Sequence, residues 1–357
     1  MGQFYLGFEL GLSADFNISM IMKEENVFVV FAKQNTVVLE RGPVPQAKEG
    51  EVLIRTRKTL ISTGTELTRL SGEFPKDSAW ARYSVYPCRS GYDNIGIIIG
   101  VGKGVNEELV GKRVGTYGEH ARFVVSRADE LRFVRDDVSD DEAVFYTIAE
   151  IVLNGVRRAG VRLGDSVVIY GAGLLGQLAA RFCRLCGARP VFVVDVSDER
   201  LKLLPDDKTI VGVNSKSCDV QKVVSERTKG RMAGIVFEVT GNPALIPSEF
   251  GVLMRQGRFI VLSSPRGPTL FDFHDLCNSP SYTIIGTHNG SHPAFESPEN
   301  PWTKLRDDEF FFDLVADGEV DVKGLVSHLE PYTKAPELYR MLLKDRTKAM
   351  GVVLDWT

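Results

Sequence analysis

Two patterns of hydrophobic spacing divide the chain into regions. From about Val27 to Val125, short β-rich runs such as VFVVF, TVVLE and NIGIIIGVG are separated by turn residues. This pattern predicts an all-β region. From about Asp141, helical stretches alternate with apolar strands such as DSVVIYG, PVFVVDV and GIVFEVTG. That alternation predicts an α/β fold with a doubly wound parallel sheet that has helices on both faces.

The end of the chain indicates how the two regions are joined. We expect helices near Asp307 to Asp317 and near Ala335 to Lys344, followed by the strand GVVLDW. A terminal strand most simply rejoins the first β region, which makes the parallel sheet an insertion. We therefore predict one domain from residues 25–145 and 287–357, a second from residues 146–286, and a cleft between them. Residues 1–24 are interpreted as a mobile extension or an artefact of start-codon choice.

Composition narrows the class of protein and of partner. A length of 357 residues fits roughly two domains. Hydrophobic residues make up 43% and charged residues 25%, which excludes disordered, fibrous and membrane classes. The net charge is -4 without a dense basic block, which argues against nucleic acid or a membrane as partner and favours a small molecule.

The cysteines and the N-terminus indicate the cytoplasm. The five cysteines are scattered, which is typical of reduced thiols. Cys183 and Cys186 form a C-x-x-C on a predicted helix face of core residues, so we interpret them as structural. The opening stretch lacks a basic n-region and is interrupted by Glu9 and Asp15, so we expect no signal peptide.

A dinucleotide motif is the strongest signal in the sequence. After the strand Val167 to Tyr170, three glycines (Gly171, Gly173 and Gly176) stand in G-x-G-x-x-G spacing before a helical run. This context predicts a tight turn, a close approach of the backbone to a pyrophosphate, and close packing of helix on strand. Asp195 ends the next strand, where a carboxylate accepts hydrogen bonds from the adenosine ribose.

With the motifs LISTGTELTRLSG, SGYDNIGIIIGVG and GAGLLG in this order, the chain resembles the medium-chain dehydrogenase/reductase superfamily, the fold of zinc alcohol and polyol dehydrogenases. The resemblance extends from about Val27 to Trp356 and implies a GroES-like β-rich catalytic domain interrupted by a Rossmann domain. The STGTE and HNGSHP...NPWT segments are similar to the bacteriochlorophyllide dehydrogenase-like branch. From Asp195 we predict NAD as cofactor, with further contacts from Leu174, Leu175, Arg200, Thr240 and Ser263.

The zinc ligands of that superfamily are absent from the matching positions. Thr63 stands where the zinc enzymes have a cysteine, and Tyr92 where they have a histidine. The third ligand position falls at Tyr146 or Thr147. The segment from Gly100 to Val125, where a four-cysteine cluster holds the structural zinc, contains no cysteine. We therefore predict an enzyme without zinc.

Without zinc, side chains must stabilise charge on the substrate oxygen. Thr65 keeps the hydroxyl position of the superfamily and can relay a proton, while the Tyr92 phenol can donate to a carbonyl or, with a lowered pKa, accept from an alcohol. Asp93 and Glu66 are candidates to orient them. Alternatively, Tyr92 fills the volume that zinc would occupy, Asp93 binds the backbone and Thr65 belongs to a turn.

Other candidates carry weaker signals. Glu150 is the only carboxylate near the third ligand position, and His288 or His292, in the loop GTHNGSHP, either contacts substrate or belongs to a solvated or subunit-contact loop. We interpret His120 as structural.

The leading hypothesis is an NAD-dependent dehydrogenase acting on a secondary alcohol or ketone of a sugar, cyclitol or polyol. The alternatives are an NADPH-dependent enone or quinone reductase, an epimerase or lyase with tightly bound NAD, and a non-catalytic nucleotide-binding protein. Asp195 argues against NADP, although Arg200 lies close enough to soften this preference. By analogy with the superfamily, the strand from Tyr282 to Gly286 joins two subunits in a homodimer or homotetramer.

Overall fold

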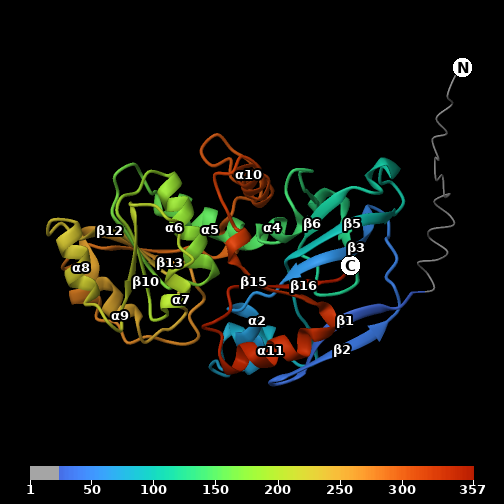
Figure 1. Ribbon diagram of the computed structural model, residues 1–357, viewed down its shortest axis with the longest axis horizontal. Helices are drawn as coiled ribbons and strands as arrows, with labels where there is room; N and C mark the ends of the chain where they lie inside the picture. Colours follow the sequence, from blue (N-terminus) through green and yellow to red (C-terminus); the bar gives the residue numbers. More distant parts are fainter. Residues whose placement is uncertain (1–23) are drawn as a thin grey trace, which may run out of the picture.

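The computed structural model describes residues 24–357. The predicted extension therefore lies, except for Glu24, outside the described residues. Strands and helices separate into a parallel α/β part on the left of Figure 1 and a β-rich part on the right, with helices between them. None of the helices in residues 24–357 has the length and apolar character needed to cross a membrane.

The β-rich part contains two sheets within the described residues. The larger has the order β15-β16-β3-β5-β6-β8, with β7 also paired to β3, and the smaller has the order β2-β1-β4. Their strands are β1 (Asn26–Lys33), β2 (Thr36–Gly42), β3 (Glu51–Leu60), β4 (Cys88–Arg89), β5 (Asn94–Val101), β6 (Arg113–Thr116), β7 (Phe123–Arg127), β8 (Arg132–Phe133), β15 (Val326–Pro331) and β16 (Gly351–Asp355). β16 pairs antiparallel with β3, so the closing strand does rejoin the first part of the chain.

The all-β prediction missed two helices in this part. α2 (Thr65–Ser71) and α3 (Ala79–Tyr83) lie between β3 and β4. α2 is short, and the buried Leu67 and Leu70 place only one apolar pair on its inner face, where it packs against α11 (Ala335–Lys344). Because so short a segment has little helical periodicity, its conformation depends on tertiary packing.

The parallel part is a six-stranded sheet with the order β11-β10-β9-β12-β13-β14. These strands are β9 (Val167–Tyr170), β10 (Val191–Asp195), β11 (Ile210–Asn214), β12 (Ala233–Glu238), β13 (Leu253–Val261) and β14 (Thr283–Gly286). All six residues of β12 are buried, as expected for a central strand that is covered on both faces. The order reverses at β9, so the loops after β9, β10 and β12 meet at one crevice.

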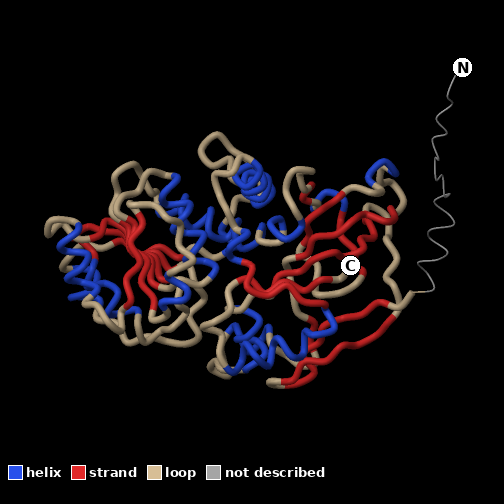
Figure 2. Tube along the Cα trace, viewed as in Figure 1, coloured by secondary structure: helices blue, strands red, loops and turns tan. Residues whose placement is uncertain are grey.

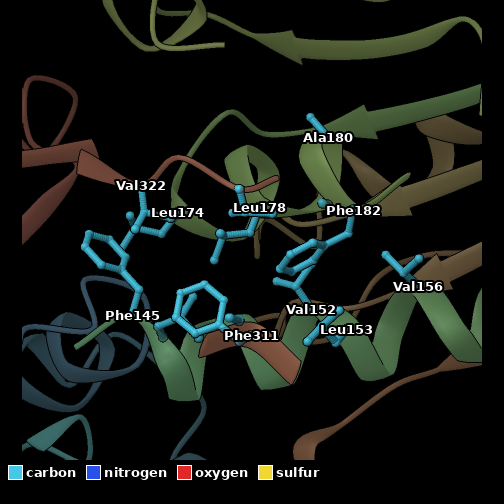
Figure 3. Packing of buried hydrophobic residues seen from close by; sticks show 14 of the residues in the cluster. Phe145, Val152, Leu153, Val156, Leu174, Leu178, Ala180, Phe182, Phe311 and Val322 are labelled. Carbon is cyan, nitrogen blue, oxygen red and sulfur yellow. The ribbon is translucent and has the colours of Figure 1, made fainter. Parts of the chain in front are cut away.

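Helices cover both faces of this sheet and connect it to the β-rich part. They are α4 (Asp140–Ala143), α5 (Tyr146–Ala159), α6 (Leu174–Leu185), α7 (Asp198–Leu201), α8 (Val220–Arg227), α9 (Ile246–Glu249) and α10 (Lys304–Ala316). Figure 3 shows α5 side chains Val152 and Leu153 packed against Leu178 and Phe182 of α6 and Phe311 of α10. This core fixes the crevice of the parallel sheet relative to the β-rich part.

Candidate active site

A cavity of about 410 Å³ lies where the two parts meet. The parallel part contributes the loops after β9, β10, β12 and β13, and the β-rich part contributes the start of α2 together with Tyr92. Of the residues predicted from sequence, the cavity lining includes Thr65, Tyr92, Gly171, Gly173, Leu174, Leu175, Asp195, Arg200, Thr240 and Ser263. The structure thus brings candidates from the two separate motif regions into one site.

The three glycines have different steric surroundings. Gly171 has a φ of +108°, which favours glycine, and a Cβ on Gly176 would lie 1.8 Å from the Gly171 carbonyl oxygen. A Cβ on Gly173 would meet no atom within 4 Å. Gly173 is the N-cap of α6, so the free amides of the first helical turn border open space in the cavity. This cradle fits the pyrophosphate of a nicotinamide dinucleotide.

Asp195 is tied to the glycine loop. Its carboxylate accepts hydrogen bonds from the Ala172 amide at 2.7 Å and the Ser197 amide at 2.9 Å, and it lines the cavity. A carboxylate has about four lone-pair sites, so two remain for ribose hydroxyls. The Arg200 guanidinium lies 3.9 Å away, so the negative charge beside the ribose position is partly balanced.

Glu238 at the end of β12 supports the cavity and was not predicted from the sequence. Its buried carboxylate accepts hydrogen bonds from the Thr240 amide at 2.7 Å, the Gly241 amide at 2.9 Å and the Ser263 hydroxyl. Thr240 and Ser263 line the cavity on loops from adjacent strands, so Glu238 fixes both loops. A polar residue at the end of the apolar run GIVFE was the available signal.

Hydroxyl groups line the opposite end of the cavity. The Tyr92 hydroxyl donates a hydrogen bond to Ser62, which the sequence analysis did not single out, and Thr63, Thr65 and Thr68 also line this end. Burial and the neighbouring Asp93 carboxylate raise the pKa of Tyr92. Tyr92 therefore remains a neutral phenol at physiological pH and is a hydrogen-bond donor, not a base.

Asp93 and Glu66 lie behind the cavity wall. Asp93 is fully buried, and neither of its carboxylate oxygens has a hydrogen-bond partner in residues 24–357. Burial, with Glu66 and Glu150 nearby, raises the pKa of Asp93 well above its ordinary value.

Glu66 has the opposite environment. Burial opposes its ionisation, but His120, Tyr339 and the Ser62 amide together lower the pKa of Glu66. The His120 Nε2 atom lies 3.1 Å from its carboxylate, and the Ser62 amide donates to it at 2.8 Å. Glu66 thus holds the start of α2 in place, and the structural interpretation of His120 is confirmed.

The structure does not bring Glu150 or His288 to the cavity. Glu150 is fully buried and accepts a hydrogen bond from the Tyr117 hydroxyl, on the side of α5 that faces α10. His288 is exposed, and its Nδ1 atom accepts a hydrogen bond from the Gly290 amide at 3.0 Å. His292 is buried 3.4 Å from Asp307. These positions give no direct contact with a ligand in the cavity.

The residues at the expected zinc position do not fit the metal. Thr147 donates a hydrogen bond to the Tyr92 carbonyl at 3.3 Å, and the Tyr146 ring packs near Tyr117 and Phe312. Throughout the described part of the chain, no group of three or more His, Cys, Asp or Glu side chains has an arrangement that could hold a metal ion. Threonine and a neutral phenol are poor zinc ligands.

Known proteins resemble the chain in sequence. Residues 175–302 match the family described as zinc-binding dehydrogenase. D-guloside 3-dehydrogenase of Escherichia coli K12 is 27% identical over 250 residues, 69% of this chain and 71% of that protein. L-threonine 3-dehydrogenase of Bacillus subtilis is 24% identical over 356 residues, covering 90% of this chain and 94% of that protein.

Solved structures share the fold. Galactitol-1-phosphate dehydrogenase of Escherichia coli has a TM-score of 0.78 at 17% identity, covering 92% of this chain and 99% of that one. A structure described as a short chain alcohol dehydrogenase of Escherichia coli CFT073, with NADH, has a TM-score of 0.78 at 16% identity, covering 93% and 99%. The predicted fold class is thereby confirmed. In its fold and its sequence relatives, the chain is similar to the medium-chain dehydrogenase/reductase superfamily of NAD(P)-dependent oxidoreductases.

Proposed function

We propose that this enzyme transfers a hydride between NAD and a secondary alcohol or ketone of a sugar, cyclitol or polyol, without zinc. One observation carries the proposal: the end of the cavity opposite Asp195 is lined by hydroxyl groups and offers no set of metal ligands within the described residues. Hydroxyl side chains suit a polyhydroxylated substrate, because they can both donate and accept hydrogen bonds. The names of the guloside and galactitol-1-phosphate dehydrogenases support the same substrate class.

The hydroxyl groups have different roles toward the substrate oxygen. A bound nicotinamide cofactor supplies or accepts the hydride. Because the pKa of Tyr92 is raised, its phenol donates a hydrogen bond to the substrate oxygen as negative charge develops there. Ser62 accepts the Tyr92 hydrogen bond in the free protein and is therefore the group that the substrate oxygen replaces. Thr65 relays the alcohol proton toward water in the cavity.

The choice of NAD rests on Asp195. A 2′-phosphate beside this carboxylate would be repelled by about 3 to 4 kcal/mol per unit charge at 4 to 5 Å and an effective dielectric of ~20. Arg200 at 3.9 Å offsets part of that repulsion. We expect NAD to bind more tightly than NADP, and titration of both cofactors tests this. Equal affinities would contradict the role given to Asp195.

A substrate panel tests the reaction itself. Purified protein should reduce NAD, followed by absorbance at 340 nm, with at least one member of a panel of polyols and cyclitols. The activity should survive dialysis against a chelator, and elemental analysis should find well under one zinc per chain. Stoichiometric zinc that is lost together with activity would refute metal independence.

We further propose a homodimer that forms through β14. This strand is at the edge of the parallel sheet, pairs only with β13 in the described residues, and exposes 41% of Ile284. An open apolar edge strand is a template for pairing with a second copy. Sedimentation that finds only monomer at micromolar concentration would contradict this.

All five cysteines are free thiols, which supports our placement of the enzyme in the cytoplasm.

A further inference from the structure

Two of the three tryptophans in the chain have neighbours that cover their rings. The guanidinium groups of Arg157 and Arg306 lie 3.2 and 4.5 Å from the centre of the Trp302 ring. The Trp356 indole stacks on the Tyr332 ring, with 4.5 Å between the ring centres and 3° between the planes. The aromatic faces of both residues therefore have partners inside the protein.

Trp80, in the short helix α3, has no such partner. It is partly buried and lines the cavity, but no aromatic ring or guanidinium group of residues 24–357 lies against its indole, and the indole N–H makes no hydrogen bond there. None of the hydrophobic clusters of the described residues includes Trp80. An indole has a large apolar area to bury. At Trp80 that area is left for a ligand in the cavity.

Trp80 lies on the side of the cleft that is remote from Asp195. Asp195 ends β10, and the loop after β13 is three strands further across the sheet, roughly 14 Å away. A Cβ on Gly267 of that loop would be 3.8 Å from the Pro75 side chain. The Pro75 carbonyl accepts a hydrogen bond from the Ser78 amide at 3.0 Å, and Ser78 caps α3, so Trp80 follows directly on this turn. A dinucleotide crosses the crevice from its adenosine ribose at Asp195, so the β13 side receives the nicotinamide and the substrate.

The β-rich part offers the cavity two kinds of surface. Between β3 and β5, the lining residues are the Trp80 indole, one glycine and five hydroxyl-bearing side chains, those of Ser62, Thr63, Thr65, Thr68 and Tyr92. A closed sugar or cyclitol ring has matching surfaces, with hydroxyl groups around its edge and C–H groups on its face. Hydroxyl side chains both donate to and accept from the edge. The face of an aromatic ring carries partial negative charge and attracts the weakly positive C–H groups.

We propose that Trp80 is a stacking platform for the C–H face of a closed ring, so that the site prefers a pyranoside or cyclitol to an open-chain polyol. The inference rests on the proposed function for the reaction and narrows its substrate class. An open-chain polyol has no fixed face and loses rotational freedom about each C–C bond when it is held against the indole. A closed ring has already lost that freedom, so the same contact gives it more net affinity.

Matched pairs of compounds test this preference. Methyl glucopyranoside with sorbitol, and methyl galactopyranoside with galactitol, compare a closed ring with an open chain, and myo-inositol represents the cyclitols. Binding to the NADH-saturated protein, which avoids turnover, is measured by titration calorimetry and by saturation-transfer NMR, which identifies the ligand protons that contact the protein. Reduction of NAD at 340 nm gives kcat and KM for each compound that is oxidised.

Three substitutions separate stacking from bulk. Trp80→Ala removes the platform, Trp80→Leu keeps an apolar side chain without an aromatic face, and Trp80→Phe keeps a smaller aromatic face. The matched control is Tyr83→Ala, because Tyr83 is an aromatic residue of the same helix that is 72% exposed and does not line the cavity.

We expect Trp80→Ala to bind the ring-form compounds about tenfold or more weakly and to raise their KM by a similar factor. The value of kcat should stay nearly unchanged, because stacking stabilises the bound substrate and the transition state alike. Trp80→Phe should lose the least affinity, and Trp80→Leu an intermediate amount. Saturation transfer should be strongest for the axial protons on one face of the ring, should vanish in Trp80→Ala and should persist in Tyr83→Ala.

The proposal is overturned if open-chain polyols bind as tightly as their ring-form partners and lose as much affinity in Trp80→Ala. It is also overturned if no ring-form compound binds, or if Trp80→Ala binds them as the wild type does. An equal loss of NADH affinity in Trp80→Ala would overturn it too, because the indole would then pack on the cofactor. Ring-form binding that depends on Trp80, in a protein that oxidises neither class of compound, would support the platform and refute the proposed function alone.

Discussion

Glu249→Gln should change how the stability of the protein depends on pH. Glu249 ends α9, is 1% exposed, and has no hydrogen-bond partner for either carboxylate oxygen in residues 24–357. Burial, with a contribution from Glu238, raises the pKa of Glu249 from 4.5 to about 9. Between these two values the folded protein keeps a proton that the unfolded chain has lost.

The sign and size of the effect follow from that proton. Stability falls as pH rises from 4.5 toward 9, by about 1.4 kcal/mol per pH unit for one proton. From pH 5 to pH 8 the loss is about 4 kcal/mol. Glutamine does not titrate, so the variant lacks this slope. Its buried amide adds a cost of about 1–3 kcal/mol that does not change with pH.

Urea unfolding at pH 5, 6, 7 and 8 measures the difference directly. At pH 5, the free energy of unfolding of Glu249→Gln should be no greater than that of the wild type. The difference should shift in favour of the variant with each increase in pH, so that by pH 8 the variant is the more stable protein. The exposed Glu226→Gln on α8 is the matched control and should follow the wild type. If the curves of Glu249→Gln and the wild type ran parallel across this range, the burial argument would be refuted.

Three further predictions concern the site. Tyr92→Phe and Thr65→Val should keep the fold and the affinity for NAD but lower kcat about 10²-fold to 10³-fold, with the larger loss for Tyr92→Phe. Near-native turnover of both variants on the true substrate would show that the two hydroxyl groups only fill space. Gly173→Ala should fold normally yet bind NADH weakly, because its methyl group enters open cavity space, whereas Gly176→Ala should lose thermal stability because its Cβ would lie 1.8 Å from a carbonyl oxygen. Calorimetric titration with NADH and thermal melting curves measure the two effects. If both variants lost the same affinity and the same stability, the assigned roles would be wrong. Glu66→Gln should cost about 3–5 kcal/mol in urea unfolding at pH 7, because it breaks a buried pair with His120; a loss under about 1 kcal/mol would show that the pair contributes little.

The dinucleotide half of the site could be predicted from sequence because its determinants are local. The run from Val167 to Gly176 contains strand, turn and helix start in ten consecutive residues. Asp195 could be placed because a carboxylate at the end of an apolar strand lies at the sheet's crevice. Helix α11 over Ala335–Lys344 matched its prediction because its apolar periodicity is strong.

What only the tertiary structure decided is which distant residues meet. Glu66 lies 54 residues from His120 and 273 from Tyr339, yet one buried carboxylate contacts both. Tyr92 stands at one lost zinc-ligand position and Glu150 near another, but α5 turns Glu150 toward Tyr117 and away from the cavity, whereas Tyr92 lines it. Trp80 carries no motif at all and lines the cavity because the segment before α3 lies beside the loop after β13. The spacing of hydrophobic residues reflects the local backbone conformation. Contacts across the cleft depend instead on how the sheets pack, and no local pattern in the sequence encodes that packing.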